Sequence, residues 1–192
     1  MLFFLGALEF DGLAANLIKR ANHSAIKLVT LITAHFPGFR DTTVYQGRLI
    51  HFYKRAQIFV ADIWGAYGRQ RLTTTDATIT TTASPFVFHD IDALTMFADY
   101  RVPQILEHVG VMIYSPALQA ALDAQQVIPF GHEWEQEIRA ATVLAVEMIR
   151  NSLQKQKGIS LLSVEIDWLL WNLGEVMKDN IRSHHRTLTI YY

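Results

Sequence analysis

Charged side chains stand inside two of the most apolar segments of this sequence, and this restricts the folds that the chain can adopt. Residues 96–104 read MFADYRVPQ, so an acid lies between two aromatic residues, and a base follows them shortly before a proline. Residues 52–64 read FYKRAQIFVADIW, so a lysine, an arginine and an aspartate have similar neighbours. A buried charge needs a partner, and perturbed charges gather at functional sites. The fold must therefore pair these charges or use them.

The composition favours one compact domain over residues 1–192. Of the 192 residues, 51% are hydrophobic, which is enough for a full core. The formal net charge of -1 predicts no broad attraction to nucleic acid or to a membrane surface. The sequence contains no cysteine, which excludes disulfides, thiolate chemistry and cysteine-ligated zinc. The apolar first eight residues lack a basic region, so we expect a cut edge of a larger fold and not a signal peptide.

Apolar residues recur at helical spacing through most of the sequence, which predicts a mainly α helical bundle. The predicted helices cover residues 24–36, 54–67, 116–122, 134–156 and 163–177. A small β-hairpin is predicted around Gln46 and Gly47, and residues 184–192 alternate like a short strand.

Residues 90–103 predict a junction between two helices. Asp90 and Asp92 are both suited to cap a helix that ends near Asp99, and Pro103 is suited to start the next helix. Asp99 is then expected where the two helices meet.

Several kinds of catalytic motif are missing from the sequence. It has no Walker loop, no strand-linked GxGxxG, no HExxH and no nucleophile elbow, so no cofactor is expected. His184 and His185 are adjacent and do not converge on a metal, so we interpret them as a hydrogen-bonded pair in the tail. No metal site is predicted.

Other candidate residues have a structural explanation. Glu133, Glu135, Glu137 and Arg139 fit a solvated first turn of a helix, in which Glu137 lies near the buried boundary and is a candidate ligand contact. A separate group of aromatic residues is predicted to lie in the core: Trp64, Trp168 and Trp171.

Asp99 and Lys54 are the strongest candidates for chemistry. A carboxylate beside Phe97 and Tyr100 can be held ionised by a nearby lysine while it faces a cavity. Such a group can stabilise a developing cation or activate water. A structural ion pair explains the same residues equally well, and the sequence does not separate the two interpretations.

At these residues the sequence resembles the queuosine salvage protein family, whose members are queuosine 5′-phosphate N-glycosylases. The resemblance is carried by residues 39–41 (FRD), 45–47 (YQG), 52–57 (FYKRAQ), 61–64 (ADIW), 95–104 (TMFADYRVPQ), 135–139, 147–150, 184–185 (HH) and 191–192 (YY). These segments follow the order of the family along nearly the whole chain.

The resemblance implies an all-helical fold similar to helix-hairpin-helix DNA glycosylases, acting on a free nucleotide. The implied reaction hydrolyses the N-glycosidic bond of queuosine 5′-phosphate and releases queuine for salvage into tRNA modification, in the cytoplasm. It also implies that the chain corresponds to the C-terminal part of the family fold, without the N-terminal portion whose aromatic residues help to form the base pocket.

The resemblance also implies roles for individual residues. Asp99 would be the catalytic carboxylate, and Lys54 would partner it and help to hold the substrate. Arg101 would contact the phosphate. The residues expected to line or brace the substrate pocket are Tyr53, Asp62, Phe97, Tyr100, Arg101 and, from its position in the sequence, Glu137.

A different class of function stays open, namely a catalytically inactive fragment or interaction module that keeps the nucleotide-binding half of the family fold. A DNA glycosylase is disfavoured, because no basic stripe is visible. The sequence therefore predicts a small-molecule nucleotide as the partner, with no nucleic acid and no membrane, and leaves the oligomeric state open.

Residues 73–82 are dominated by threonine and show no apolar periodicity, so we expect an exposed loop. Deletion of this segment should change the free energy of unfolding by less than about 0.5 kcal/mol, measured by urea denaturation, because the segment contributes nothing to the core. A loss of several times that amount would show that the segment packs against the core.

Overall fold

The computed structural model describes residues 9–69 and 84–192. The threonine-rich residues 73–82 and the apolar first eight residues lie outside the described part. The described chain is mainly helical with one antiparallel hairpin, as the spacing of apolar residues predicted. It forms two compact units, Met1–Asp41 with Tyr53–Leu94, and Thr42–Phe52 with Thr95–Tyr192.

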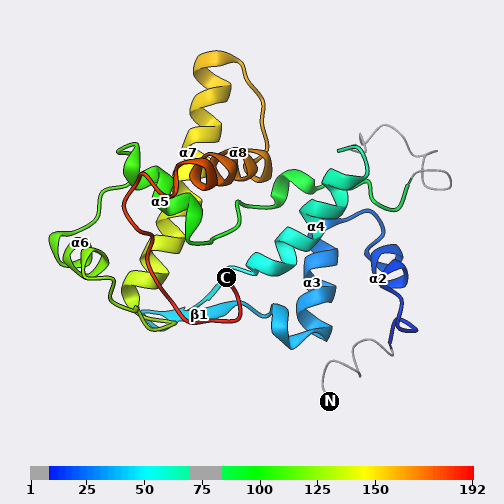
Figure 1. Cartoon of the computed structure of the whole chain (residues 1–192). Helices are drawn as coiled ribbons and strands as arrows, with labels where there is room; N and C mark the ends of the chain where they lie inside the picture. Colours follow the sequence, from blue (N-terminus) through cyan, green and yellow to red (C-terminus); the bar gives the residue numbers. More distant parts are fainter. Residues whose placement is uncertain (1–8, 70–83) are drawn as a thin grey trace. The chain divides into compact units, whose positions relative to one another are not determined.

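The first unit is built on two packed helices, α3 and α4, with α2 against α3 (Figure 1). Its elements are α2 (Ala14–Ala21), α3 (Ala25–His35), η1 (Pro37–Phe39), α4 (Lys54–Ala66) and η3 (Ile91–Ala93). Leu28, Ile32, Val60 and Trp64 are buried, which confirms the prediction that Trp64 lies in a core.

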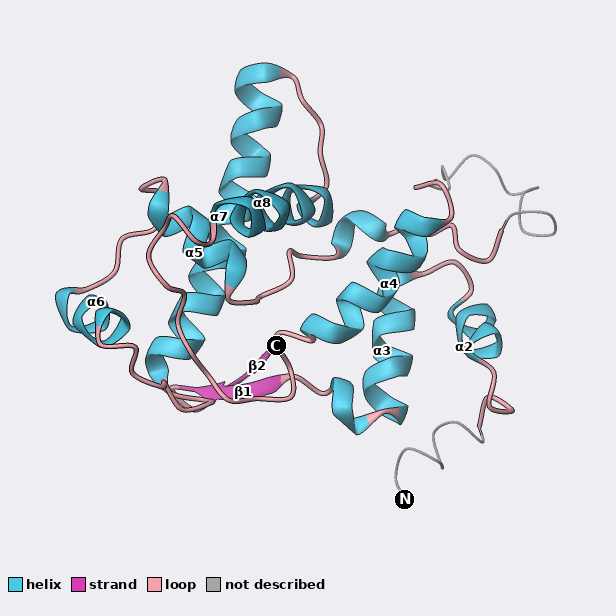
Figure 2. Cartoon of the chain, in the orientation of Figure 1, coloured by secondary structure: helices cyan, strands magenta, loops and turns pink. Residues whose placement is uncertain are grey.

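The second unit packs α8 against α5 and α7, beside the hairpin (Figure 2). Its elements are β1 (Thr42–Tyr45), β2 (Arg48–His51), α5 (Arg101–His108), α6 (Pro116–Asp123), α7 (Glu133–Lys157) and α8 (Ser163–Met177). Phe52, Met96, Val102, Val146 and Ile166 share one apolar core, so residues just before α5 pack with residues from α7 and α8.

The sequence signals for turns and caps are confirmed at several places. Tyr45 pairs with Arg48 across a two-residue turn in which Gln46 and Gly47 both have positive φ, the conformation that a tight hairpin needs. Ser115 caps α6 by accepting from the Leu118 amide at 3.3 Å, and Pro116 follows in the first turn. The predicted bounds of α8 are those observed.

The predicted helix that ends near Asp99 is wrong. Only the short η3 forms after Asp90, and residues 94–99 are not helical. Asp90 does act as a cap, but for α3: its carboxylate accepts from the Ala25 amide at 2.5 Å and from the Ser24 hydroxyl at 2.6 Å. The Asp90 carboxylate can cap α3 although it is distant in sequence, because the first amides of a helix have no partner within the helix. Asp99 therefore follows a segment without regular secondary structure and precedes one helix, α5.

Two further predictions also need correction. Leu169, Trp171 and Leu173 of α8 are exposed, and Val176 of the same helix is 80% exposed. These positions are therefore not core, and Trp168 is only half-buried. Residues 184–192, which alternate in sequence, do not form a strand among the described residues. They make one isolated β-bridge, between Arg186 and Val127. Alternation alone does not supply a partner strand.

A glycine allows α5 and α8 to approach closely. A Cβ atom on Gly174 would lie 2.8 Å from the Cγ and Cδ atoms of Arg101. The aliphatic part of Arg101 thus fills the space that a side chain on α8 would otherwise occupy, and its guanidinium reaches Glu175. Helix packing at this point places a buried cation two residues after Asp99.

We predict that Asp90→Ala destabilises the protein by about 1–3 kcal/mol, because the α3 amides and the Ser24 hydroxyl lose a charged acceptor. Denaturant unfolding of Asp92→Ala provides the control, since Asp92 is exposed on the same short helix. Equal stability of the two variants would show that the Asp90 cap contributes nothing.

Candidate functional site

Hydrogen bonds to other elements hold three consecutive residues, Phe97, Ala98 and Asp99. The Phe97 amide donates to Asp167 of α8 at 2.9 Å, and the Ala98 carbonyl accepts from Arg139 of α7 at 3.0 Å. One carboxylate oxygen of Asp99 accepts from the amides of Arg101 and Val102, both at 3.0 Å. Asp99 is 4% exposed, so this carboxylate is fixed at the start of α5.

Arg139 is the centre of a largely buried cluster beside Ala98. Its guanidinium pairs with Glu135 at 3.3 Å, and both side chains have 0% exposure. The guanidinium carbon also lies 4.0 Å from the ring centroid of Phe52 and 4.6 Å from that of Tyr192. The Tyr192 hydroxyl donates to Glu135 at 2.8 Å. Burial raises the pKa of Tyr192, so this hydroxyl remains a donor at neutral pH.

Glu135 and Arg139 were predicted to lie on a solvated turn, and that prediction is wrong. Glu137 was expected near the buried boundary, but its side chain is exposed and accepts from the Tyr45 hydroxyl at 2.7 Å. The helix thus turns Glu135 and Arg139, one turn apart, toward the core and leaves Glu137 outside. The i,i+4 pair looked like a surface ion pair because sequence spacing does not say which face is buried.

Tyr100 and Arg101 are held by the tail and by α8. The ring of Tyr100 lies against His184, with 4.3 Å between the ring centroids. Arg101 donates to Glu175 at 2.6 Å and to Gln104, and its guanidinium carbon lies 5.4 Å from the Tyr100 ring centroid. A hydrogen bond from Lys178, with a further contribution from Arg101, lowers the pKa of Glu175, so both cations are balanced by an ionised carboxylate.

A shallow depression with basic side chains borders Arg101. Its volume is about 350 Å³. Its lining residues are Arg101, Gln104, Gln125, Lys178, Asp179, Ser183, His184 and Arg186. The lining contains three cationic side chains and one aspartate, so it suits an anion more than a cation.

The tail packs His185 into the second unit. The His184 Nδ1 atom lies 2.6 Å from the His185 carbonyl oxygen, as expected for a hydrogen-bonded pair. His185 is buried and packs against Tyr192, and its Nε2 has no hydrogen-bond partner among the described residues. Burial, with a smaller effect of His184 and Arg139, lowers the pKa of His185 to about 3.

The remaining candidates lie at the start of α4, in the first unit. The Tyr53 amide donates to the Asp41 carbonyl at 3.1 Å, and the Lys54 amide donates to the Asp41 carboxylate at 3.2 Å. Tyr53 has φ 47°, in the left-handed region. Asp62 is two turns further along α4, and partial burial raises its pKa. Lys54 and Asp99 belong to different units, and their pairing stays a prediction.

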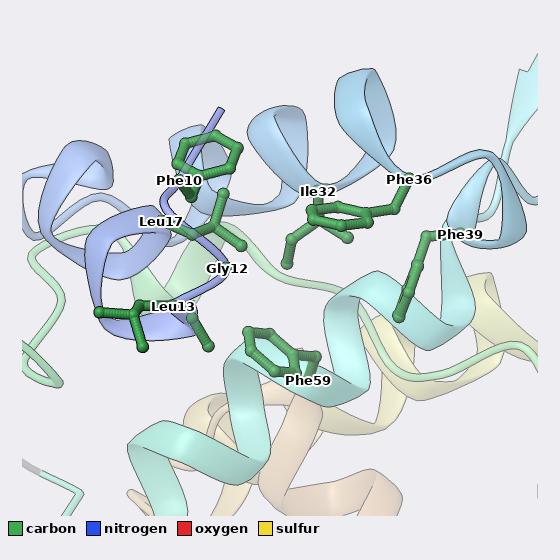
Figure 3. A pocket seen from close by; sticks show the side chains of 9 residues that line it. Phe10, Gly12, Leu13, Leu17, Ile32, Phe36, Phe39 and Phe59 are labelled. Carbon is green, nitrogen blue, oxygen red and sulfur yellow. The ribbon is translucent and has the colours of Figure 1, made fainter. Parts of the chain in front are cut away.

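A separate cavity in the first unit is apolar. It has a volume of about 280 Å³, and Figure 3 shows the rings of Phe10, Phe36, Phe39 and Phe59 around it. Leu13, Leu17 and Ile32 complete most of its wall. The described residues bring no charged side chain to this wall, so the cavity does not have the polar groups that orient a nucleotide.

The described parts of the chain show no group of three histidine or carboxylate side chains arranged to hold a metal ion. Nor is any helix in residues 9–69 or 84–192 both long enough and apolar enough to cross a membrane.

The family of the chain follows from a comparison of its sequence with family models. The family model described as queuosine salvage protein matches residues 5–192, so the chain belongs to this family. The match includes the Asp99 segment, the start of α4 and the Arg139 cluster.

Individual relatives are named queuosine 5′-phosphate N-glycosylase/hydrolase. The chain is 49% identical to the protein of Dictyostelium discoideum over 183 residues, which are 95% of this chain and 53% of the relative. It is 41% identical to the protein of Sphaerobacter thermophilus and 35% identical to that of Mus musculus, in each case over 96% of this chain and 53% of the relative. The chain therefore spans about half the length of these relatives.

Several residues that shape the site were not predicted from the sequence. Asp167 and Glu175 hold the Phe97 amide and Arg101, and Asp41 holds the start of α4. Asp167 and Glu175 carried one available signal, because each is an acid within an otherwise apolar helix. Their partners are about seventy residues away in the sequence, so local spacing could not name them.

His185 predicts a pH dependence of stability. Its folded-state pKa of about 3 lies below the ordinary value of 6.5, so the unfolded chain binds the proton first and stability falls as the pH drops below 6.5. His185→Phe should remove up to about 1.4 kcal/mol per pH unit of this slope between pH 6 and pH 4. Urea unfolding at several pH values measures the slope, with His108→Gln, an exposed histidine, as the control. An unchanged slope in His185→Phe would contradict the assignment.

Proposed function

We propose that this chain hydrolyses the N-glycosidic bond of queuosine 5′-phosphate and releases queuine, which is then available for tRNA modification. The observation that carries the proposal is the family match over residues 5–192, together with 49% identity to a relative named for this activity. The chain spans about half of each relative, so the activity of the relatives does not carry over without a test on this chain.

The proposed reaction uses Asp99 as its carboxylate. The bond between the anomeric carbon and the glycosidic nitrogen breaks, its electron pair leaves with the base, and the ribose carbon gains positive charge. Water then adds to this carbon, one of its protons is lost to a base, and the leaving nitrogen gains a proton. A fixed carboxylate stabilises the cationic ribose and accepts the proton of the water. The hydrogen bonds to one Asp99 oxygen support this role, because they orient the carboxylate before substrate binds.

Lys54 is proposed to partner Asp99 and to hold the substrate. Tyr53, Asp62, Phe97, Tyr100 and Glu137 remain predicted contacts of the substrate pocket. The predicted phosphate contact of Arg101 is supported by the basic depression that it borders with Lys178 and Arg186. Because Arg101 already pairs with Glu175, we expect it mainly to brace α5 against α8.

The wider predictions remain proposals as well. We propose a cytoplasmic protein in which residues 1–192 act as one domain related to helix-hairpin-helix DNA glycosylases. The mainly helical fold of the described residues supports this relation, and the near-neutral charge agrees with a small nucleotide as the substrate.

Incubation of the purified chain with queuosine 5′-phosphate, followed by mass detection of queuine and ribose 5-phosphate, tests the proposal. Asp99→Asn should lower the rate by at least about 100-fold, while its side-chain oxygen still accepts the α5 amides and preserves the fold. Asp92→Asn is the control, because Asp92 is exposed on η3.

The outcomes separate the two classes of function. Equal rates for the parent and Asp99→Asn would show that Asp99 is not the catalytic carboxylate. If folded parent releases no queuine, the hydrolase proposal for this chain fails. A rise in melting temperature with queuosine 5′-phosphate but no product would then identify a nucleotide-binding module.

A further inference from the structure

We infer that Arg139 is a positioning residue for Asp99, held in place by Glu135 and by the Tyr192 hydroxyl. The inference rests on the proposed function, because Asp99 is the proposed catalytic carboxylate. It assigns a role in the reaction to a buried cluster whose members do not themselves need to touch the substrate.

The geometry links Tyr192 to Asp99 through a continuous set of contacts. The Tyr192 hydroxyl donates to Glu135 at 2.8 Å, Glu135 pairs with Arg139 at 3.3 Å, and Arg139 donates through Nε to the Ala98 carbonyl at 3.0 Å. That carbonyl belongs to the peptide bond between Ala98 and Asp99. The orientation of this peptide therefore decides where the Asp99 side chain begins.

Residues 94–99 need such external support because they form no regular secondary structure. The Phe97 amide is held by Asp167, which fixes one end of the segment. The Asp99 carboxylate is held by the start of α5. Arg139 supplies the hydrogen bond between these two points, so loss of its donor would allow the Ala98 peptide to rotate. Displacement of a catalytic group by about 1 Å can cost on the order of 100-fold in rate.

Further contacts fix the orientation of both side chains of the ion pair. The Arg139 guanidinium carbon lies over the rings of Phe52 and Tyr192, at 4.0 and 4.6 Å from their centroids, which restricts the orientation of the guanidinium. Glu135 also accepts from the Gly131 amide at 3.1 Å, so its carboxylate is fixed from a second direction. These contacts set the direction in which Nε points, and lysine cannot reproduce that direction.

The experiment compares Tyr192→Phe and Arg139→Lys with the parent chain. Tyr192→Phe removes one hydroxyl and keeps the ring. We expect it to lower kcat for queuosine 5′-phosphate roughly threefold to tenfold, and Arg139→Lys to lower kcat by more than about tenfold. KM should change less than about twofold in Tyr192→Phe, because the cluster acts through Asp99 and not on the bound substrate. Tyr191→Phe is the matched control, since Tyr191 contacts Phe130 through its ring and should keep the parent kcat.

Amide hydrogen exchange of the free protein gives a second readout that needs no activity. The Arg101 and Val102 amides report the Asp99 cap directly, because both donate to its carboxylate. Arg139→Lys should speed their exchange by at least about tenfold, while amides of α6 stay at the parent rate in a chain that remains folded.

The two readouts distinguish failure of this inference from failure of the proposed function. If the parent is active, an unchanged kcat in both variants overturns the inference, as does an equal rise in KM with kcat intact. If the parent releases no queuine, the proposed function fails, and exchange alone decides: faster exchange at Arg101 and Val102 supports positioning, and parent rates overturn it. If Arg139→Lys does not fold, the same measurements on Tyr192→Phe give the decision, at the smaller effect expected for it.

Discussion

The second unit depends on one fully buried ion pair, that of Arg139 and Glu135. Removal of either partner would leave an uncompensated charge in the core, at a cost of about 3–5 kcal/mol. An apolar pair of the same volume would avoid that cost, so the charges are not explained by stability alone. What an apolar pair cannot supply is a donor for the Ala98 carbonyl and an acceptor for Tyr192. The ion pair therefore joins a helix, an irregular segment and the tail at one point.

Much of the fold was predictable because local rules governed it. The Gln46-Gly47 turn has the backbone that its residues favour, and the serine before Pro116 caps its helix as such residues commonly do. The predictions failed where a distant residue supplied what a local one was expected to supply. Asp90 caps α3 and not a helix of its own. Residues 94–99 are not helical, and side chains of α8 and α7 bond the Phe97 amide and the Ala98 carbonyl.

The candidate site also combines residues that the local sequence marked with residues that distant contacts position. The local pattern around Asp99 marked it as unusual, because a charged side chain in an apolar segment must be paired or used. Arg139 gave no comparable signal, since an arginine four residues after a glutamate is typical of an exposed helix surface. Which face of α7 is buried is decided by Phe52 and by the tail, both far away in the sequence. The opposite error occurred in α8, where the helical spacing of Trp171 and Leu173 predicted core positions and both residues are exposed.

Tyr53 has a backbone conformation that a tyrosine rarely adopts. Its left-handed backbone, at φ 47°, costs a side chain with a Cβ atom roughly 1 kcal/mol that glycine would not incur. The strain lies in the link between the hairpin and α4, directly before Lys54. Selection for stability alone would replace the tyrosine with glycine or asparagine. The ring of Tyr53 is therefore kept at a cost in stability, directly before the helix that begins with Lys54.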